Sequence, residues 1–114
     1  MVSGFAIDDA DYRSALALVA RARADIASIL KPFDIVLAPC VNGEAPVGLH
    51  YAGDPSFQAL WTLLHLPSIT IPANRGPNRM PVGLQLVAGA GHDDKLLAAG
   101  LWMQQVAKIG LDAR

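Results

Sequence analysis

Residues 34–87, DIVLAPCVNGEAPVGLHYAGDPSFQALWTLLHLPSITIPANRGPNRMPVGLQLV, decide the fold of this chain of 114 residues. The stretch opens with an unbroken apolar run, residues 35–38, which Pro39 follows directly. Short uninterrupted apolar runs are typical of strands that are covered on both faces. We therefore expect a central strand here, with parallel neighbours.

Two further strands are predicted by alternation. Ile69 and Ile71 alternate with polar residues, and the apolar residues of 82–87 recur at every second position. Strict alternation indicates a strand with two different faces. The link between them, residues 73–80, is too short for a parallel crossover, which needs a dozen or more residues. The two strands should be antiparallel neighbours.

Three helices are predicted around these strands. Apolar residues recur at threes and fours from Tyr12 to Leu30, after a start at Asp8 or Asp9 and before Pro32. A second helix begins near Asp54-Pro55 and stops before Pro67, and a third begins at residues 92–94. The order is helix, strand, helix, strand, strand, helix. We expect one α/β domain spanning residues 1–114, with a small mixed sheet flanked by helices.

Composition excludes several classes of function. Hydrophobic residues make up 53% of the chain and charged residues 17%, so the chain has apolar surface to hide. A formal net charge of -1 gives no electrostatic basis for binding nucleic acid or an anionic membrane. Pro67 and Pro72 interrupt the uncharged stretch 55–74, which argues against a membrane helix. Cys40 is the single cysteine, which fits a reducing compartment, the cytoplasm.

No motif in the sequence predicts catalysis, a metal or a cofactor. The three histidines, His50, His65 and His92, lack the spacing of a metal site. The glycines do not form a dinucleotide fingerprint. Cys40 stands at a strand end, where a nucleophile can occur, but a packed thiol is the simpler interpretation. We therefore expect no catalytic residue, no metal and no cofactor within this chain.

Six motifs occur in the right order for a known family: DIVLAP at 34–39, EAP at 44–46, GDP at 53–55, WTLLHLP at 61–67, SITIP at 68–72 and MPVGLQLV at 80–87. Together they resemble the C-terminal end of an amidase-signature hydrolase. This resemblance implies a segment of an enzyme that cleaves amide C–N bonds. It also implies a catalytic Lys, a Ser in a cis peptide and a nucleophilic Ser in a Gly/Ser-rich signature upstream, and this sequence contains no such signature.

The resemblance further implies roles for individual residues. Cys40, Trp61 and Thr62 would help to wall the acyl or leaving-group pocket of a complete enzyme, where a small-molecule amide binds. Many relatives carry Thr or Ser at the position of Cys40. Relatives usually carry Gly at the position of His65, so this histidine departs from the family's turn between helix and strand.

Two functional hypotheses follow. In the first, the chain is the C-terminal fragment or subunit of an amidase and is inactive alone, because the catalytic triad is absent. In the second, it is a stand-alone, non-catalytic α/β module for binding or self-assembly. The expected partner is either a second copy, in a homo-oligomer, or the missing catalytic part. The low charge between Asp54 and Asp93 favours self-association of the isolated chain.

Overall fold

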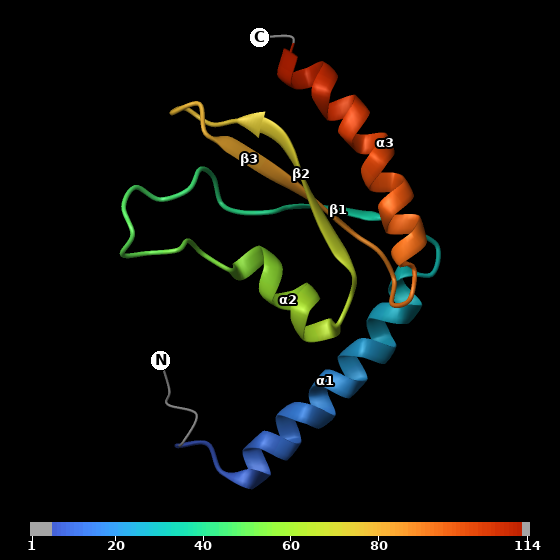
Figure 1. Cartoon of the computed structure of the whole chain (residues 1–114). Helices are drawn as coiled ribbons and strands as arrows, with labels where there is room; N and C mark the ends of the chain where they lie inside the picture. The colour runs from blue at the N-terminus through green and yellow to red at the C-terminus, as the bar shows by residue number, and fades with distance from the viewer. Residues whose placement is uncertain (1–5, 113–114) are drawn as a thin grey trace.

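A computed structural model describes residues 6–112 and, for residues 108–112, the backbone only. The elements in chain order are α1 (Asp9–Leu30), β1 (Val36–Pro39), α2 (Ser56–Leu64), β2 (Ser68–Arg75), β3 (Pro81–Val87) and α3 (Asp93–Asp112), as Figure 1 shows. This order confirms the predicted α/β architecture and the predicted succession of elements. No helix within the described range is long and apolar enough to cross a membrane.

The sheet differs from the prediction in one respect. Its order is β1-β3-β2, and β3 is antiparallel to both neighbours. The predicted hairpin of β2 and β3 is confirmed, but the mixed sheet and the central, parallel β1 are wrong. β1 is an edge strand whose residues Val36 and Leu37 pair with Val87 and Leu86. The expected cover on both faces is also wrong, because Val36 and Ala38 are half-buried while Leu37, on the opposite face, is exposed. An edge strand has a neighbour on one side only, so an apolar run alone does not make a strand central.

The two faces of the sheet are covered by different helices. On one face, Val87 packs with Leu30 of α1 and Leu64 of α2 in what we call the α1/α2 cluster. On the other face, Leu86 packs with Leu96 of α3 in the α3 cluster. Consecutive residues of β3 thus point to opposite layers, as the pleat of a strand requires. The result is a three-layer segment with β3 at its centre (Figure 1).

Both open edges of the sheet contain a proline, Pro39 at the end of β1 and Pro72 within β2. In an antiparallel ladder, successive residues of the central strand bond to alternate neighbours. The Gly83 carbonyl accepts from the Cys40 amide at 3.3 Å, so Gly83 bonds toward β1. Its partner on β2, Pro72, must then direct its backbone groups outward. Pro39, one residue before Cys40, likewise faces outward. Proline has no backbone N–H, so each open edge has one hydrogen-bond donor fewer. This disfavours pairing with another strand.

The molecule is flat and extended for its length. Its principal extents are 54 × 39 × 17 Å and its radius of gyration is 17.2 Å. A compact domain of this size has a radius of gyration of about 13 Å. The excess arises from α1, whose N-terminal half runs away from the sheet (Figure 1). Much of the apolar surface that a domain normally buries therefore stays accessible.

Candidate functional site

A group of four residues, which we call the polar layer, lies between α2 and the sheet: Cys40, Gln58, Thr70 and Gln85. The Cys40 Sγ lies 3.2 Å from the Thr70 Oγ1. The Gln58 Nε2 donates to the Cys40 carbonyl oxygen at 3.4 Å and lies 3.5 Å from the Cys40 Sγ. Gln85 pairs with Thr70 across the β2–β3 ladder, so both side chains lie on the α2 face. One helix and all three strand segments thus meet at the thiol.

The polar layer has a buried floor and an accessible rim. Cys40 and Gln85 are 8% and 4% exposed, respectively. Gln58 and Thr70 are both exposed to solvent. A molecule that approaches this side of the sheet would therefore meet an amide and a hydroxyl group first, with the thiol behind them. The thiol is held as a packed, hydrogen-bonded group, and its burial limits its use as a nucleophile.

Gly83 makes this close approach possible. A Cβ atom placed on Gly83 would lie 2.5 Å from the Thr70 Cγ2 and 3.2 Å from the Cys40 Cβ. No real side chain tolerates the first of these distances. The absence of a side chain at Gly83 therefore lets Cys40 and Thr70 meet across β3, from the two outer strands of the sheet.

Two buried polar atoms near this layer have no hydrogen-bond partner among the described residues: the Trp61 Nε1 and the Gln85 Oε1. Trp61 packs against the α1/α2 cluster, on the same side of the sheet as Gln85. An unpaired buried donor or acceptor costs about 1–3 kcal/mol. One atom is a donor and the other an acceptor, so a group that offers both, such as water or a primary amide, has the chemistry to satisfy them.

The three residues implied by the resemblance do not all lie together. Cys40 and Trp61 are on the same side of the sheet, and Gln58, one helical turn before Trp61, contacts Cys40. Thr62 is exposed, and its Oγ1 donates to the Gln58 carbonyl oxygen at 3.2 Å. Thr62 therefore lies on the outer side of α2 and outside the polar layer.

The long loop after β1 is tied to the β2–β3 turn by one carboxylate. The Glu44 Oε1 accepts from the backbone amides of Asn78 at 2.8 Å and Met80 at 3.0 Å, and its Oε2 accepts from the Asn78 Nδ2 at 2.7 Å. Gly76 must lack a side chain here, because a Cβ atom would collide with the Glu44 side chain. Residues 41–46 and 51–54 of this loop line an open hollow of about 390 Å³.

Asp54 holds the end of this loop to the start of α2. Its carboxylate accepts hydrogen bonds from the Ser56 hydroxyl, from the Ser56 amide at 2.9 Å and from the Asn42 Nδ2 at 2.8 Å. The hydrogen bond from the Ser56 hydroxyl, followed by that from the Ser56 amide, lowers the pKa of Asp54 below its ordinary value. The carboxylate is therefore held in its charged form at the beginning of α2, where a negative charge is favourable.

His65 ends α2 in a left-handed conformation, with φ 56° and ψ 39°. The His65 amide donates to the Thr62 carbonyl oxygen at 3.2 Å, and the Leu66 amide to the Trp61 carbonyl oxygen at 3.0 Å. Glycine is the residue that adopts this conformation without strain. The glycine that the resemblance implies at this position therefore has a physical reason, and His65 carries the strain of its Cβ atom.

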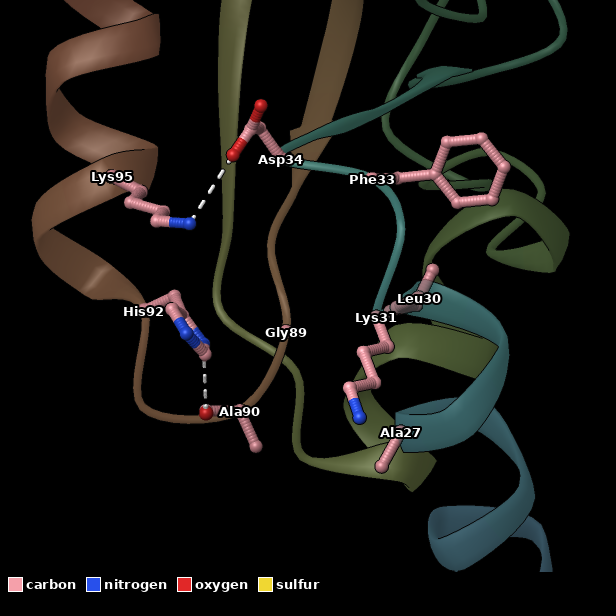
Figure 2. A pocket seen from close by; sticks show the side chains of 9 residues that line it. All are labelled: Ala27, Leu30, Lys31, Phe33, Asp34, Gly89, Ala90, His92 and Lys95. Carbon is pink, nitrogen blue, oxygen red and sulfur yellow. Dashed lines mark hydrogen bonds and ion pairs between the residues drawn. The ribbon is translucent and has the colours of Figure 1, made fainter.

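A second hollow, of about 240 Å³, lies where the end of α1 meets the start of α3 (Figure 2). Lys31, Asp34, His92 and Lys95 line it. The Lys95 Nζ lies 3.2 Å from the Asp34 Oδ1, and the His92 Nδ1 lies 3.2 Å from the Ala90 carbonyl oxygen. The Lys95 charge is already paired, so the hollow offers no concentrated positive charge to an anion. Among the side chains that the structure describes, those of residues 6–107, no group of three or more His, Cys, Asp or Glu could hold a metal ion.

Sequence reasoning missed the participation of Gln58, Thr70 and Gln85. Thr70 and Gln85 alternate with buried residues such as Ile71 and Leu86, which is the pattern of strands with one solvated face. In the structure α2 covers part of that face. The apolar run of β1 does not signal this coverage, because Leu37, on the other face of that strand, is exposed.

Several known proteins are similar to this chain in sequence or in structure. A glutamyl-tRNA(Gln) amidotransferase subunit from Prochlorococcus marinus is 32% identical over 108 residues, which are 89% of this chain and 22% of that protein. Indoleacetamide hydrolase of Allorhizobium ampelinum is 40% identical over 45 residues, 40% of this chain and 10% of that protein. A crystal structure of an amidase superposes with a TM-score of 0.72 at 32% identity, over 90% of this chain and 26% of that chain. This chain is a C-terminal amidase-signature segment. No protein-family model matches it.

The amidase-signature segment spans about a fifth of the length of the amidotransferase subunits that it matches over most of its own length. The likeness to the amidase structure covers nearly all of its fold, so the three-layer arrangement of helices and sheet is that of the family. The polar layer and the loop held by Glu44 are therefore parts of an amidase-signature fold.

Proposed function

We propose that this chain is the C-terminal portion of a hydrolase that cleaves amide C–N bonds, and that it is inactive without a catalytic portion. The observation that carries this proposal is the agreement with an amidase structure over 90% of the chain, at a TM-score of 0.72 and 32% identity. The catalytic portion supplies the Lys, the Ser in a cis peptide and the nucleophilic Ser that the family resemblance implies.

The role proposed for the chain is to wall the substrate pocket of the complete enzyme. Cys40 and Trp61 lie on one side of the sheet, and the unpaired Trp61 Nε1 and Gln85 Oε1 are suited to a polar group. Thr62 faces outward from α2, where it is free to contact the catalytic portion or the substrate. The thiol of Cys40 serves packing and hydrogen bonding in this proposal, and it does not attack the substrate.

The proposed substrate is a small-molecule amide. The names of two relatives refer to an acetamide and to an amidotransferase, which supports this chemical class. We place the complete enzyme in the cytoplasm, because the free thiol of Cys40 is stable in a reducing compartment.

The test is ammonia release from primary amides, indoleacetamide among them. The chain alone, a catalytic amidase portion alone and their mixture are assayed side by side. We expect hydrolysis from the mixture only. Ammonia release by the chain alone that disappears in Cys40→Ser would show that the thiol is the nucleophile and that the proposal is wrong. A mixture that neither associates nor hydrolyses amides would favour the alternative, a stand-alone binding or assembly module.

A further inference from the structure

The N-terminal half of α1 carries an apolar surface that is largely uncovered in the described chain. We call it the docking stripe and define it by Tyr12 and Leu16, which are exposed, and by Val19, which is half-buried at its inner end. Tyr12 and Leu16 are 59% and 51% exposed. In contrast, Leu30 at the other end of the same helix is buried in the α1/α2 cluster.

The docking stripe continues a face that is already packed. Ala22 and Ile26 pack against the α1/α2 cluster together with Leu30. Residues three and four apart share one face of a helix, so Val19, Leu16 and the residues before them extend the same line. Beyond half-buried Val19, this line of residues continues toward the N-terminus for about two further turns, through Leu16 to Tyr12. The apolar face of α1 is buried at its C-terminal end and exposed at its N-terminal end. This indicates an interface of which the described residues occupy only one part.

The direction of the docking stripe is fixed relative to α2. The Arg23 Nε and Nη2 both donate to the Leu63 carbonyl oxygen, at 3.3 and 2.9 Å, at the C-terminal end of α2. This contact lies one turn from Val19 and joins the two helices. The N-terminal half of α1 is therefore held in a set direction relative to α2.

We infer that the docking stripe is filled by the catalytic portion of the amidase-signature enzyme, an inference that rests on the proposed function. The chain spans only 22% of one matched amidotransferase protein and 26% of the amidase of known structure. About four-fifths of the family's polypeptide thus lies outside the residues described. That polypeptide must contact this segment to complete one enzyme, and the docking stripe is apolar, exposed and continuous with an existing core.

The test measures binding of the chain to the catalytic portion of that amidase, ended just before its own matching segment. The unmodified chain is compared with Leu16→Asp and with the matched control Leu18→Asp. Leu18 is 65% exposed and lies about 160° around the helix from Leu16. Both changes add one negative charge to an exposed position of α1, so circular dichroism should show the same folded helix content in all three proteins.

We expect the unmodified chain and Leu18→Asp to bind equally and Leu16→Asp to bind at least tenfold more weakly, because a charge at the centre of an apolar interface must be desolvated. Equal binding by both variants would overturn the inference and leave the proposed function standing. Absence of binding by the unmodified chain would overturn both. If Leu16→Asp instead converts a dimer of the isolated chain to a monomer and no complex with the catalytic portion forms, the occupant is a second copy and the inference is wrong.

Discussion

At the scale of single residues, the family likeness becomes most informative where this chain departs from it. His65 occupies a backbone conformation that glycine adopts freely, at the point where α2 gives way to β2. A residue with a Cβ atom in this region is strained by about 1–2 kcal/mol. The family resemblance marked His65 as unusual, because relatives usually carry glycine there. The left-handed backbone conformation at His65 explains the glycine.

We expect His65→Gly to stabilise the chain by about 1 kcal/mol, because glycine removes the strain at a modest entropic cost in the unfolded state. Urea denaturation measures the change. His65→Ala is the matched control: it also removes the imidazole ring but keeps the Cβ atom, so it should bring no gain. An equal gain from alanine would mean that the ring, and not the backbone, is the source of strain.

Asp54 gives a second prediction at this scale, and it concerns pH. Its pKa is lowered, first by the Ser56 hydroxyl, so the folded state prefers the charged carboxylate. The stabilisation is therefore complete above the ordinary carboxyl range near pH 4 and is lost as the pH falls through the lower, folded pKa. The stability difference between the chain and Asp54→Asn should shrink between pH 7 and pH 3.

A titration of the Asp54 carboxyl group by NMR identifies the cause. Ser56→Ala removes the hydrogen bond that acts most strongly, and Asn42→Ala removes the weakest of the three. We expect the pKa of Asp54 to rise more in Ser56→Ala than in Asn42→Ala. The reverse order would show that the network at the start of α2 is held chiefly by the loop amide.

At the scale of elements, the polar layer depends on how closely three strands approach one another. We expect Gly83→Ala to destabilise the chain by about 1–3 kcal/mol, because its Cβ atom would overlap the Thr70 Cγ2. Thr70→Ser keeps the hydroxyl that contacts Cys40 and removes that methyl group. The double variant should therefore recover part of the loss, and a thermal denaturation cycle measures the coupling. If the effects of Gly83→Ala and Thr70→Ser on stability simply add, the new Cβ atom does not collide with the Thr70 methyl group, and this explanation is wrong.

The loop after β1 makes a prediction of the same kind. Glu44→Ala removes three hydrogen bonds to residues 78 and 80, so we expect a loss of about 1–2 kcal/mol and faster hydrogen exchange at the amides of Asn78 and Met80. Val47→Ser, a change at an exposed position of the same loop, is the control and should alter neither amide. Unchanged exchange in Glu44→Ala would mean that the loop and the hairpin turn are held by other contacts.

Periodicity and proline positions predicted every element of this fold, because both report local conformation. They placed α1 from Asp8 or Asp9 onward, and the structure has the Asp8 carboxylate accepting the Asp11 amide as a cap. The lateral position of β1 was wrong because it depends on pairing between residues far apart in sequence. The polar layer was only partly foreseen for the same reason: Gln58 and Thr70 reach Cys40 only through the tertiary arrangement.

At the scale of the whole molecule, an extended shape and exposed apolar side chains favour association. When the catalytic portion is absent, we expect the isolated chain to form a dimer or larger homo-oligomer at micromolar concentration, since exposed apolar patches are otherwise left in water. Light scattering coupled to size exclusion gives the mass. A strictly monomeric mass would contradict this prediction.

The outward-facing Pro39 and Pro72 set a limit on the form that such association takes. Cross-β fibres grow by unlimited strand addition, and each new strand needs a row of free donors. This sheet lacks a donor at one position on each edge, at the end of β1 and within β2. The chain should therefore gather through its helices into assemblies of finite size. Even in a concentrated, agitated solution, the chain should form no cross-β fibres, whereas a three-stranded sheet with complete donors on both edges could form them.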